Sequence, residues 1–133
     1  MNALYLYAIT AVIFLVADAI MLRAVVKPVF ERHLGDWLLD PIRLGPATAF
    51  YLAYVAGLVW LVSLPAWAAD RPGAAALNGA VLGAMAYGTY EFTNLSTLSR
   101  WSWQQVMIDT AWGTVLTAGS AWAGVAILGW LLR

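Results

Sequence analysis

Residues 44–69 read LGPATAFYLAYVAGLVWLVSLPAWAA and contain no charged side chain. An α-helix needs about 20 mostly apolar residues to cross the hydrocarbon core of a bilayer, and this stretch is long enough. Strands are a poor alternative, because barrel strands alternate apolar and polar residues over about ten positions. This stretch does not alternate, so it predicts a transmembrane helix.

Three other stretches have the same character. Residues 2–26, 73–98 and 103–132 are mostly apolar and carry very few charges. The whole chain is 63% hydrophobic and 11% charged, whereas a soluble domain carries about 25% charged residues. We therefore expect a single all-α domain over residues 1–133, built as a bundle of four transmembrane helices.

The composition also limits the chemistry. The formal net charge is zero, which gives no indication of nucleic acid as a partner. The chain has no cysteine, which excludes disulfides, thiolate metal sites and cysteine nucleophiles. Its one histidine, His33, lacks the paired spacing typical of metal ligands. We expect no metal site and no cofactor, and the lipid bilayer is the expected partner.

The longest connection, residues 27–43, has a helical pattern of its own. Its apolar residues recur at helical spacing, at Val29, Phe30, Leu34, Trp37 and Leu38. Charged residues fall on the opposite side. This pattern predicts a short amphipathic helix over about 29–39 that lies in the membrane interface and ends at Asp40–Pro41.

The distribution of basic residues predicts the orientation. Those flanking the first and third loops are Arg23, Lys27, Arg32, Arg43 and Arg100, against Arg71 and Arg133 on the other side. Cytoplasmic loops carry an excess of Lys and Arg. We therefore expect the first and third loops in the cytoplasm and both termini outside.

Three carboxylates fall inside the predicted membrane segments: Asp18, Glu91 and Asp109. Given the alternating helix directions, all three are near the same membrane face. At 1.5 Å per residue, each lies roughly 8 to 14 Å from the nearest flanking arginine, Arg23 or Arg100. They therefore share one depth, and because charges facing lipid are costly, we expect them to face inward.

Small residues accompany two of these acids at helical spacing. Asp109 is in line with Gly113, Thr117, Ser120 and Gly124. Glu91 is in line with Tyr87, Gly83 and Gly79. Such stripes let helix backbones approach closely. We expect the half of the bundle beyond the acids to be packed by glycine, alanine and aliphatic side chains.

Further polar residues gather at the depth of the acids. The candidate ligand-binding residues are Asp18, Glu91, Asp109, Tyr87, Thr89, Tyr90, Thr93, Asn94 and Trp112. Three carboxylates a few ångströms apart at low dielectric cannot all stay ionised, so at least one should hold a proton. Such acids can bind a cation, relay protons, hold a polar head group or act as acid and base. Alternatively, they are protonated, or paired with Arg23 and Arg100, and only join the helices.

Four stretches resemble a known family. They are FLVADA at 14–19, AFYLAYVAG at 49–57, YGTYEFTNLSTL at 87–98 and DTAWG at 109–113. In this order they resemble the bacterial predicted membrane proteins of domain-of-unknown-function family 2177. The family's usual Asp-Leu is replaced here by Glu91-Phe92, which keeps the acid but lengthens its reach. The resemblance implies four helices in a bacterial inner membrane, and it implies no activity.

The pattern of polar residues leaves three kinds of function open. The first is binding of a small polar molecule, an ion or a lipid head group near the cytoplasmic leaflet. The second is an accessory or structural subunit, in a homo-oligomer or a larger membrane complex. The third is a lipid-modifying membrane enzyme with one of the acids as general acid or base, although no catalytic residue can be named. We favour binding over catalysis.

Overall fold

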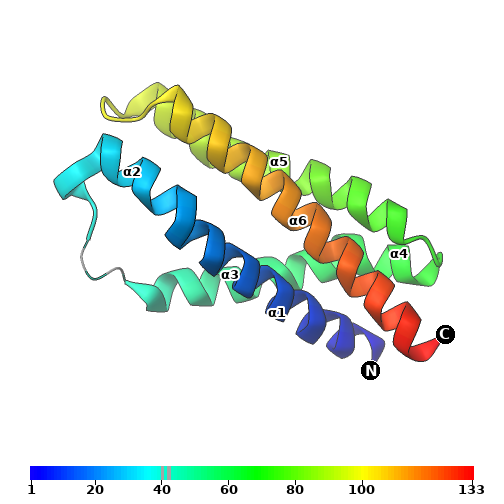
Figure 1. Ribbon diagram of the computed structural model, residues 1–133. Helices are drawn as coiled ribbons and strands as arrows, with labels where there is room; N and C mark the ends of the chain where they lie inside the picture. Colours follow the sequence, from blue (N-terminus) through cyan, green and yellow to red (C-terminus); the bar gives the residue numbers. More distant parts are fainter. Residues whose placement is uncertain (40, 42) are drawn as a thin grey trace.

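The computed structural model describes residues 1–39, 41 and 43–133, and among these residues it contains helices and no strand. Figure 1 shows the elements in chain order. They are α1 (Asn2–Met21), a π-helical turn η1 (Leu22–Val26), α2 (Lys27–Leu34), a 3-10 turn η2 (Gly35–Trp37), α3 (Leu44–Leu58), a second π-helical turn η3 (Val59–Ser63), α4 (Leu64–Ala68), α5 (Pro72–Thr97) and α6 (Trp103–Leu132).

Three helical runs are long and apolar enough to cross a membrane. Among the described residues they are Asn2–Trp37, Leu44–Ala68 and Trp103–Leu132, each of which contains an 18-residue window with a mean hydropathy of 2.3, 1.8 and 1.7, respectively. The predicted third span corresponds to α5, which is long enough but carries more glycine and polar residues. Three of the four expected crossings are thus supported, and the crossing by α5 stays a prediction.

The first run differs from the prediction in one respect. The expected transmembrane helix at 2–26 and the expected interfacial helix at 29–39 form one continuous run, with η1 joining α1 to α2. Helix geometry continues through Lys27 and Pro28. The interfacial location stays a prediction, and residue 40 of the expected end at Asp40–Pro41 lies outside the described residues.

Each π-helical turn ends shortly before a proline. The turn η1 ends two residues before Pro28, and η3 ends two residues before Pro65. A proline inside a helix lacks the N–H that would bond the carbonyl four residues earlier, and its ring clashes with that carbonyl. A π-helical turn widens the backbone at this place. Both helical runs therefore continue past their prolines, α1 into α2 and α3 into α4.

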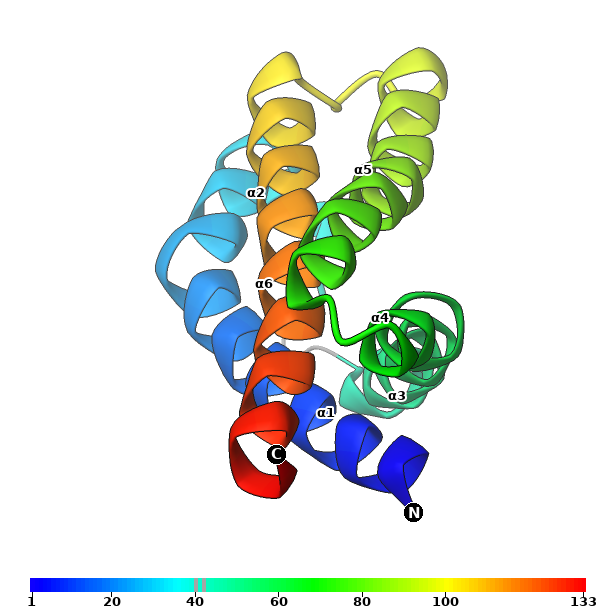
Figure 2. The same ribbon diagram turned by 90° about the vertical axis from the view of Figure 1, so that its right-hand side faces the viewer.

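The helices α5 and α6 run side by side over most of their length (Figure 2). Their contact is close because small residues meet there. A Cβ placed on Gly83 would lie 2.5 Å from the Gly113 carbonyl oxygen and 2.8 Å from Thr117 Cβ. Both predicted small-residue stripes are buried apart from the half-buried Tyr87, which confirms that they face the bundle interior.

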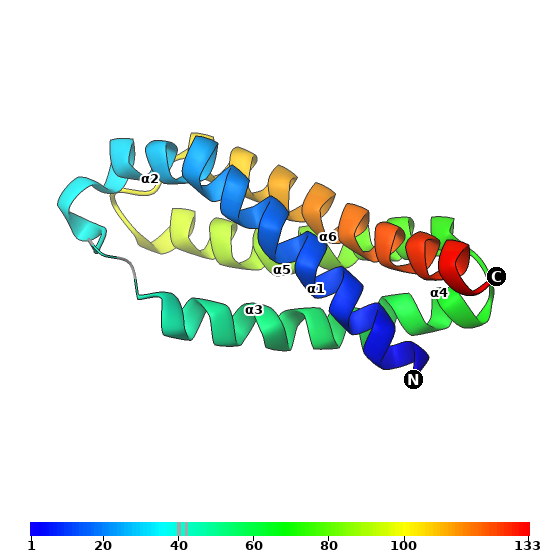
Figure 3. The same cartoon turned by 60° about the horizontal axis from the view of Figure 1, so that its bottom comes forward.

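The two ends of the bundle differ in what they hold. Figures 1 and 3 place both termini and the α4–α5 turn at one end, and α2 and the α5–α6 connection at the other. At the terminal end, Arg133 donates to Asp70 at 2.6 Å, and its guanidinium lies 3.9 Å from the centre of the Trp67 ring. Asp70 adopts a positive φ of 54° in this turn. These contacts join the C-terminus to the α4–α5 turn.

Candidate functional site

A cavity of about 740 Å³ lies at the α2 end of the bundle. Its walls come from α1, η1, α2, the start of α3, the second half of α5 and the start of α6. Pockets of roughly 300–1,000 Å³ hold small-molecule ligands in proteins. Most of its wall is apolar, with Leu22, Val26, Phe30, Leu38 and Phe50 among the lining residues.

Asp18 approaches the cavity from α1. Its side chain is buried, with 8% of its surface exposed, and it lines the cavity. The indole Nε1 of Trp112 on α6 donates to Asp18 Oδ1 at 3.0 Å. Tyr51 on α3 lies beside the same carboxyl group. The carboxyl is thereby held in place by two other helices.

Asp109 and Glu91 form a second acidic feature. Asp109, 9% exposed, lines the cavity, whereas Glu91 is fully buried behind the wall. Trp101 Nε1 donates to Glu91 Oε1 at 2.9 Å, and Glu91 Oε2 receives no N–H donor among the described residues. The two carboxyl groups lie within hydrogen-bonding reach of each other. Since an ionised carboxylate has no donor, this contact is a hydrogen bond only when one acid carries a proton.

The three acids are arranged less tightly than the sequence had suggested. Within the described part of the chain, no three His, Cys, Asp or Glu side chains approach closely enough to hold a metal ion together. Glu91 contacts Asp109. Asp18 enters the cavity from α1, and its partner is Trp112. The arrangement is one acid pair and one single acid around a cavity.

Four tyrosines complete the polar lining: Tyr51 and Tyr54 from α3, and Tyr87 and Tyr90 from α5. The Tyr54 hydroxyl lies 3.0 Å from Thr117 Oγ1. The rings of Tyr54 and Tyr87 are nearly perpendicular, at 80°, with centres 6.3 Å apart. Tyr54 and Tyr87 therefore pack edge to face where α3 and α5 line the cavity.

Nine residues were predicted from the sequence to lie at this site, and the structure places six of them at the cavity or behind its wall. Asp18, Tyr87, Tyr90 and Asp109 line the cavity, and Glu91 and Trp112 lie behind it as partners of the acids. The other three do not line the cavity. Thr89 and Thr93 are exposed, and Asn94 is half-buried next to Tyr90.

Sequence reasoning missed the contributions of α2 and α3. Tyr51 and Tyr54 stand three residues apart in an otherwise apolar helix, so they share one face with Ala47, which also lines the cavity. That spacing was a signal available in the sequence. Lys27 and Glu31 also line the cavity, and they form an ion pair at 3.8 Å. Their role depends on α2 continuing from α1, whereas residues 27–43 were expected to form a connection.

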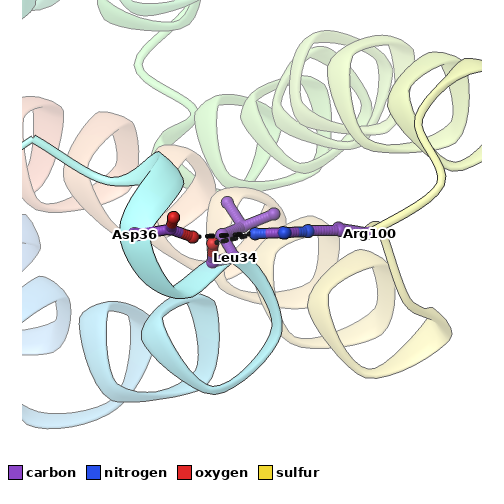
Figure 4. A network of polar contacts seen from close by, with 3 residues as sticks. All are labelled: Leu34, Asp36 and Arg100. Carbon is purple, nitrogen blue, oxygen red and sulfur yellow. Dashed lines mark hydrogen bonds and ion pairs between the residues drawn. The ribbon is translucent and has the colours of Figure 1, made fainter.

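The flanking arginines do not neutralise the acids. Figure 4 shows Arg100, whose Nη1 donates to Asp36 Oδ1 at 3.0 Å and to the Leu34 carbonyl at 3.2 Å. Its guanidinium also lies 4.4 Å from the centre of the Trp37 ring. Among the residues that the structure describes, neither Arg23 nor Arg100 pairs with an intramembrane acid. Arg100 instead fastens the end of α2 to the α5–α6 connection.

The opposite half of the bundle is more polar than expected. The hydroxyl groups of Thr10, Ser63 and Ser120 are buried there without a partner among the described residues. A Cβ on Gly124 would collide with Thr10 Oγ1. Aliphatic side chains, glycine and alanine make up most of this half, as expected, and α1, η3 and α6 add these buried hydroxyl groups to it.

A family of membrane proteins matches nearly the whole chain. The family described as predicted membrane protein, DUF2177, matches residues 3–126. The chain belongs to the DUF2177 family. This confirms the resemblance carried by the four sequence stretches, and the cavity of this DUF2177 protein lies wholly within the matched residues. No curated protein and no solved structure matches the chain.

Proposed function

We propose that this chain crosses the bacterial inner membrane four times and binds one amphiphilic molecule in the cavity, near the cytoplasmic leaflet. The setting of Asp109 carries the proposal. Its side chain is nine-tenths buried and lines the cavity, and among the described residues only Glu91, through a single proton, can donate to it, so at least one Asp109 oxygen lacks a donor. Leaving a buried polar group without a donor is costly. A ligand in the cavity would supply one.

Four crossings are supported by the pairing of α5 with α6. The 26 residues of α5 extend about 39 Å, more than the hydrocarbon thickness of about 30 Å. Gly79 and Gly83 seat α5 against Thr117 and Ala118 of α6. Because α6 is itself apolar enough to span, a helix packed along it would cross as well.

The orientation follows from charge. Five basic residues lie at the cavity end, in η1, α2, the residue before α3 and the α5–α6 connection: Arg23, Lys27, Arg32, Arg43 and Arg100. The opposite end has two, Arg71 and Arg133. The excess of positive charge favours the cavity end as the cytoplasmic one. Both termini would then be outside.

An amphiphile fits because the wall has two characters. The acids and tyrosines approach from α1, α3, α5 and α6, while Leu22, Val26 and Phe30 of the first helical run offer apolar surface next to them. A ligand with a polar head could direct it toward Asp18 and Asp109 and lay its chain along these apolar residues. A small polar solute would leave that apolar surface uncovered.

Native mass spectrometry of the purified protein tests the proposal. The wild type should retain an adduct of one discrete mass, and Asp109→Asn should lower its occupancy by about tenfold or more, since a hydrogen bond to a charged group contributes about 1.5–3 kcal/mol. Circular dichroism and gel filtration check that the variant folds.

Asp70→Asn is the matched control, because Asp70 is exposed at the opposite end and pairs with Arg133. This variant should keep the adduct at the wild-type level. Equal occupancy in all three proteins, or no adduct in the wild type, would overturn the proposal.

A further inference from the structure

We infer that the head group taken by the cavity carries a positively charged nitrogen, as in an alkylammonium. This inference rests on the proposed function and deepens it by naming the class of ligand. Three features of the cavity lead to it: its balance of charge, the state of its acids and the arrangement of its aromatic rings.

The charged side chains lining the cavity are Asp18, Asp109, Glu31 and Lys27. Lys27 pairs with Glu31 at 3.8 Å, so its charge is already matched. No basic side chain of the described residues pairs with Asp18 or Asp109. With one proton shared between Asp109 and Glu91, two of the three carboxyl groups can still carry a negative charge, and a cation in the cavity would balance it.

The hydrogen bonds of the acids leave room for a donor. Trp112 donates to one oxygen of Asp18, and the Tyr51 hydroxyl lies within hydrogen-bonding reach of the same carboxyl; both contacts orient it without adding charge. Asp109 is nine-tenths buried and faces the cavity, and only Glu91, through a single proton, can donate to it, so at least one of its oxygens lacks a donor among the described residues. A primary ammonium group meets the carboxylates with N–H donors and charge, a quaternary one by charge alone, and neither brings an acceptor.

The tyrosines favour a cation independently of the acids. A cation is attracted to the face of an aromatic ring within about 6 Å, and cages of several rings are typical of sites for quaternary ammonium groups. Tyr54 and Tyr87 meet at 80°, and Tyr51 and Tyr90 also line the cavity. Phe14 packs against Tyr51 and Tyr54 from the core, with ring centres 5.9 and 5.6 Å away, and so holds two of the tyrosine rings in place.

An anionic head group fits poorly. It would face Asp18 and Asp109, and Lys27, the one lining base among the described residues, is paired. Arg100 on the α5–α6 connection is bound to Asp36 and the Leu34 carbonyl. A phosphate or carboxylate without an ammonium partner would therefore lack a free cation in the wall.

The test compares probes that share one chain length: dodecyltrimethylammonium, dodecanoate and a neutral dodecyl glycoside, with tetramethylammonium as the head alone. Binding to the full-length protein in nanodiscs is measured by equilibrium dialysis. The variants are Asp18→Asn, Asp109→Asn, the control Asp70→Asn, and Ala86→Trp, which places a large ring on the cavity wall.

We expect dodecyltrimethylammonium to bind at least tenfold more tightly than the other two dodecyl probes. Either cavity Asp→Asn variant should remove that preference, and Asp70→Asn should keep it. Equal binding of all three dodecyl probes, blocked by Ala86→Trp, would overturn the cation inference and leave the proposed amphiphile binding standing. Tetramethylammonium binding as tightly as the dodecyl cation would support the cation and contradict amphiphile binding. Dodecyl binding that Ala86→Trp leaves unchanged would overturn both.

Discussion

Gly113 has a particular neighbour in the fold: the ring of Tyr87 occupies the position where a Cβ on Gly113 would be. This contact seats one of the cavity tyrosines against α6. Gly83, one turn before Tyr87 on α5, lies against the Gly113 carbonyl in the same way. The missing side chains therefore set both the spacing of α5 and α6 and the position of a cavity wall.

Gly113→Ala should destabilise the protein by about 1–3 kcal/mol, because the added methyl group must displace Tyr87 in a packed interior. Gly83→Ala should cost a similar amount. The matched control is Gly119→Ala on α6, where a new Cβ meets nothing within 4 Å. Unfolding in mild detergent with a denaturant measures the three. Equal stability of Gly113→Ala and Gly119→Ala would show that the close approach is absent.

The inward direction of Asp18, Glu91 and Asp109 could be predicted from the sequence because charges facing lipid are costly. Small residues on the same helix face supported this direction for Glu91 and Asp109. All three are buried in the structure. Their partners could not be predicted, since the bonds from Trp101 to Glu91 and from Trp112 to Asp18 depend on loop geometry and on helix rotation. No pattern along the chain records those two quantities.

At the scale of elements, the prediction and the structure differ at the end of the first helix. It was expected to end at Val26, before a connection over residues 27–43. The π-helical turn η1 absorbs Pro28 and lets α2 bring Lys27, Phe30 and Glu31 to the cavity. A local backbone adjustment thus supplies one wall of the site.

Pro28→Ala should remove the steric cause of η1 and let the run return to regular α geometry. A change of one residue in helix phase rotates α2 by about 100° relative to α1. We expect unchanged helix content by circular dichroism but a lower occupancy of the bound adduct in native mass spectrometry.

Pro46→Ala is the control for this change, because Pro46 lies in the first turn of α3 and is exposed. A proline there interrupts no hydrogen bond of the helix. If Pro28→Ala retains the adduct as fully as Pro46→Ala, then η1 does not position the cavity wall.

For the whole molecule, three crossings and four crossings predict different arrangements of the ends. With three, the termini would lie on opposite sides of the membrane. In the structure they lie at the same end of the bundle (Figure 1), as four crossings require. The difference turns on α5 alone, whose glycines and polar residues lower its hydropathy while fitting it to α6.

The natural absence of cysteine makes this difference measurable. Gly73→Cys and Ser99→Cys place single thiols on exposed residues just inside the start of α5 and just beyond its end. With an impermeant maleimide applied to the outer face, Gly73→Cys should react and Ser99→Cys should react only after lysis. Val81→Cys, on the exposed middle of α5, should stay unlabelled in both conditions. Reaction of both end thiols from one side would mean that α5 does not cross.

The central claim is that the cavity holds an amphiphile with its head at Asp18 and Asp109, and an experimental density map tests it most directly. A crystal structure of protein grown from a lipid phase should show one elongated density that begins between these two carboxyl groups and continues along Phe30. The contradicting result is a cavity that holds only ordered water, or one that has closed so that Asp18 and Asp109 touch directly.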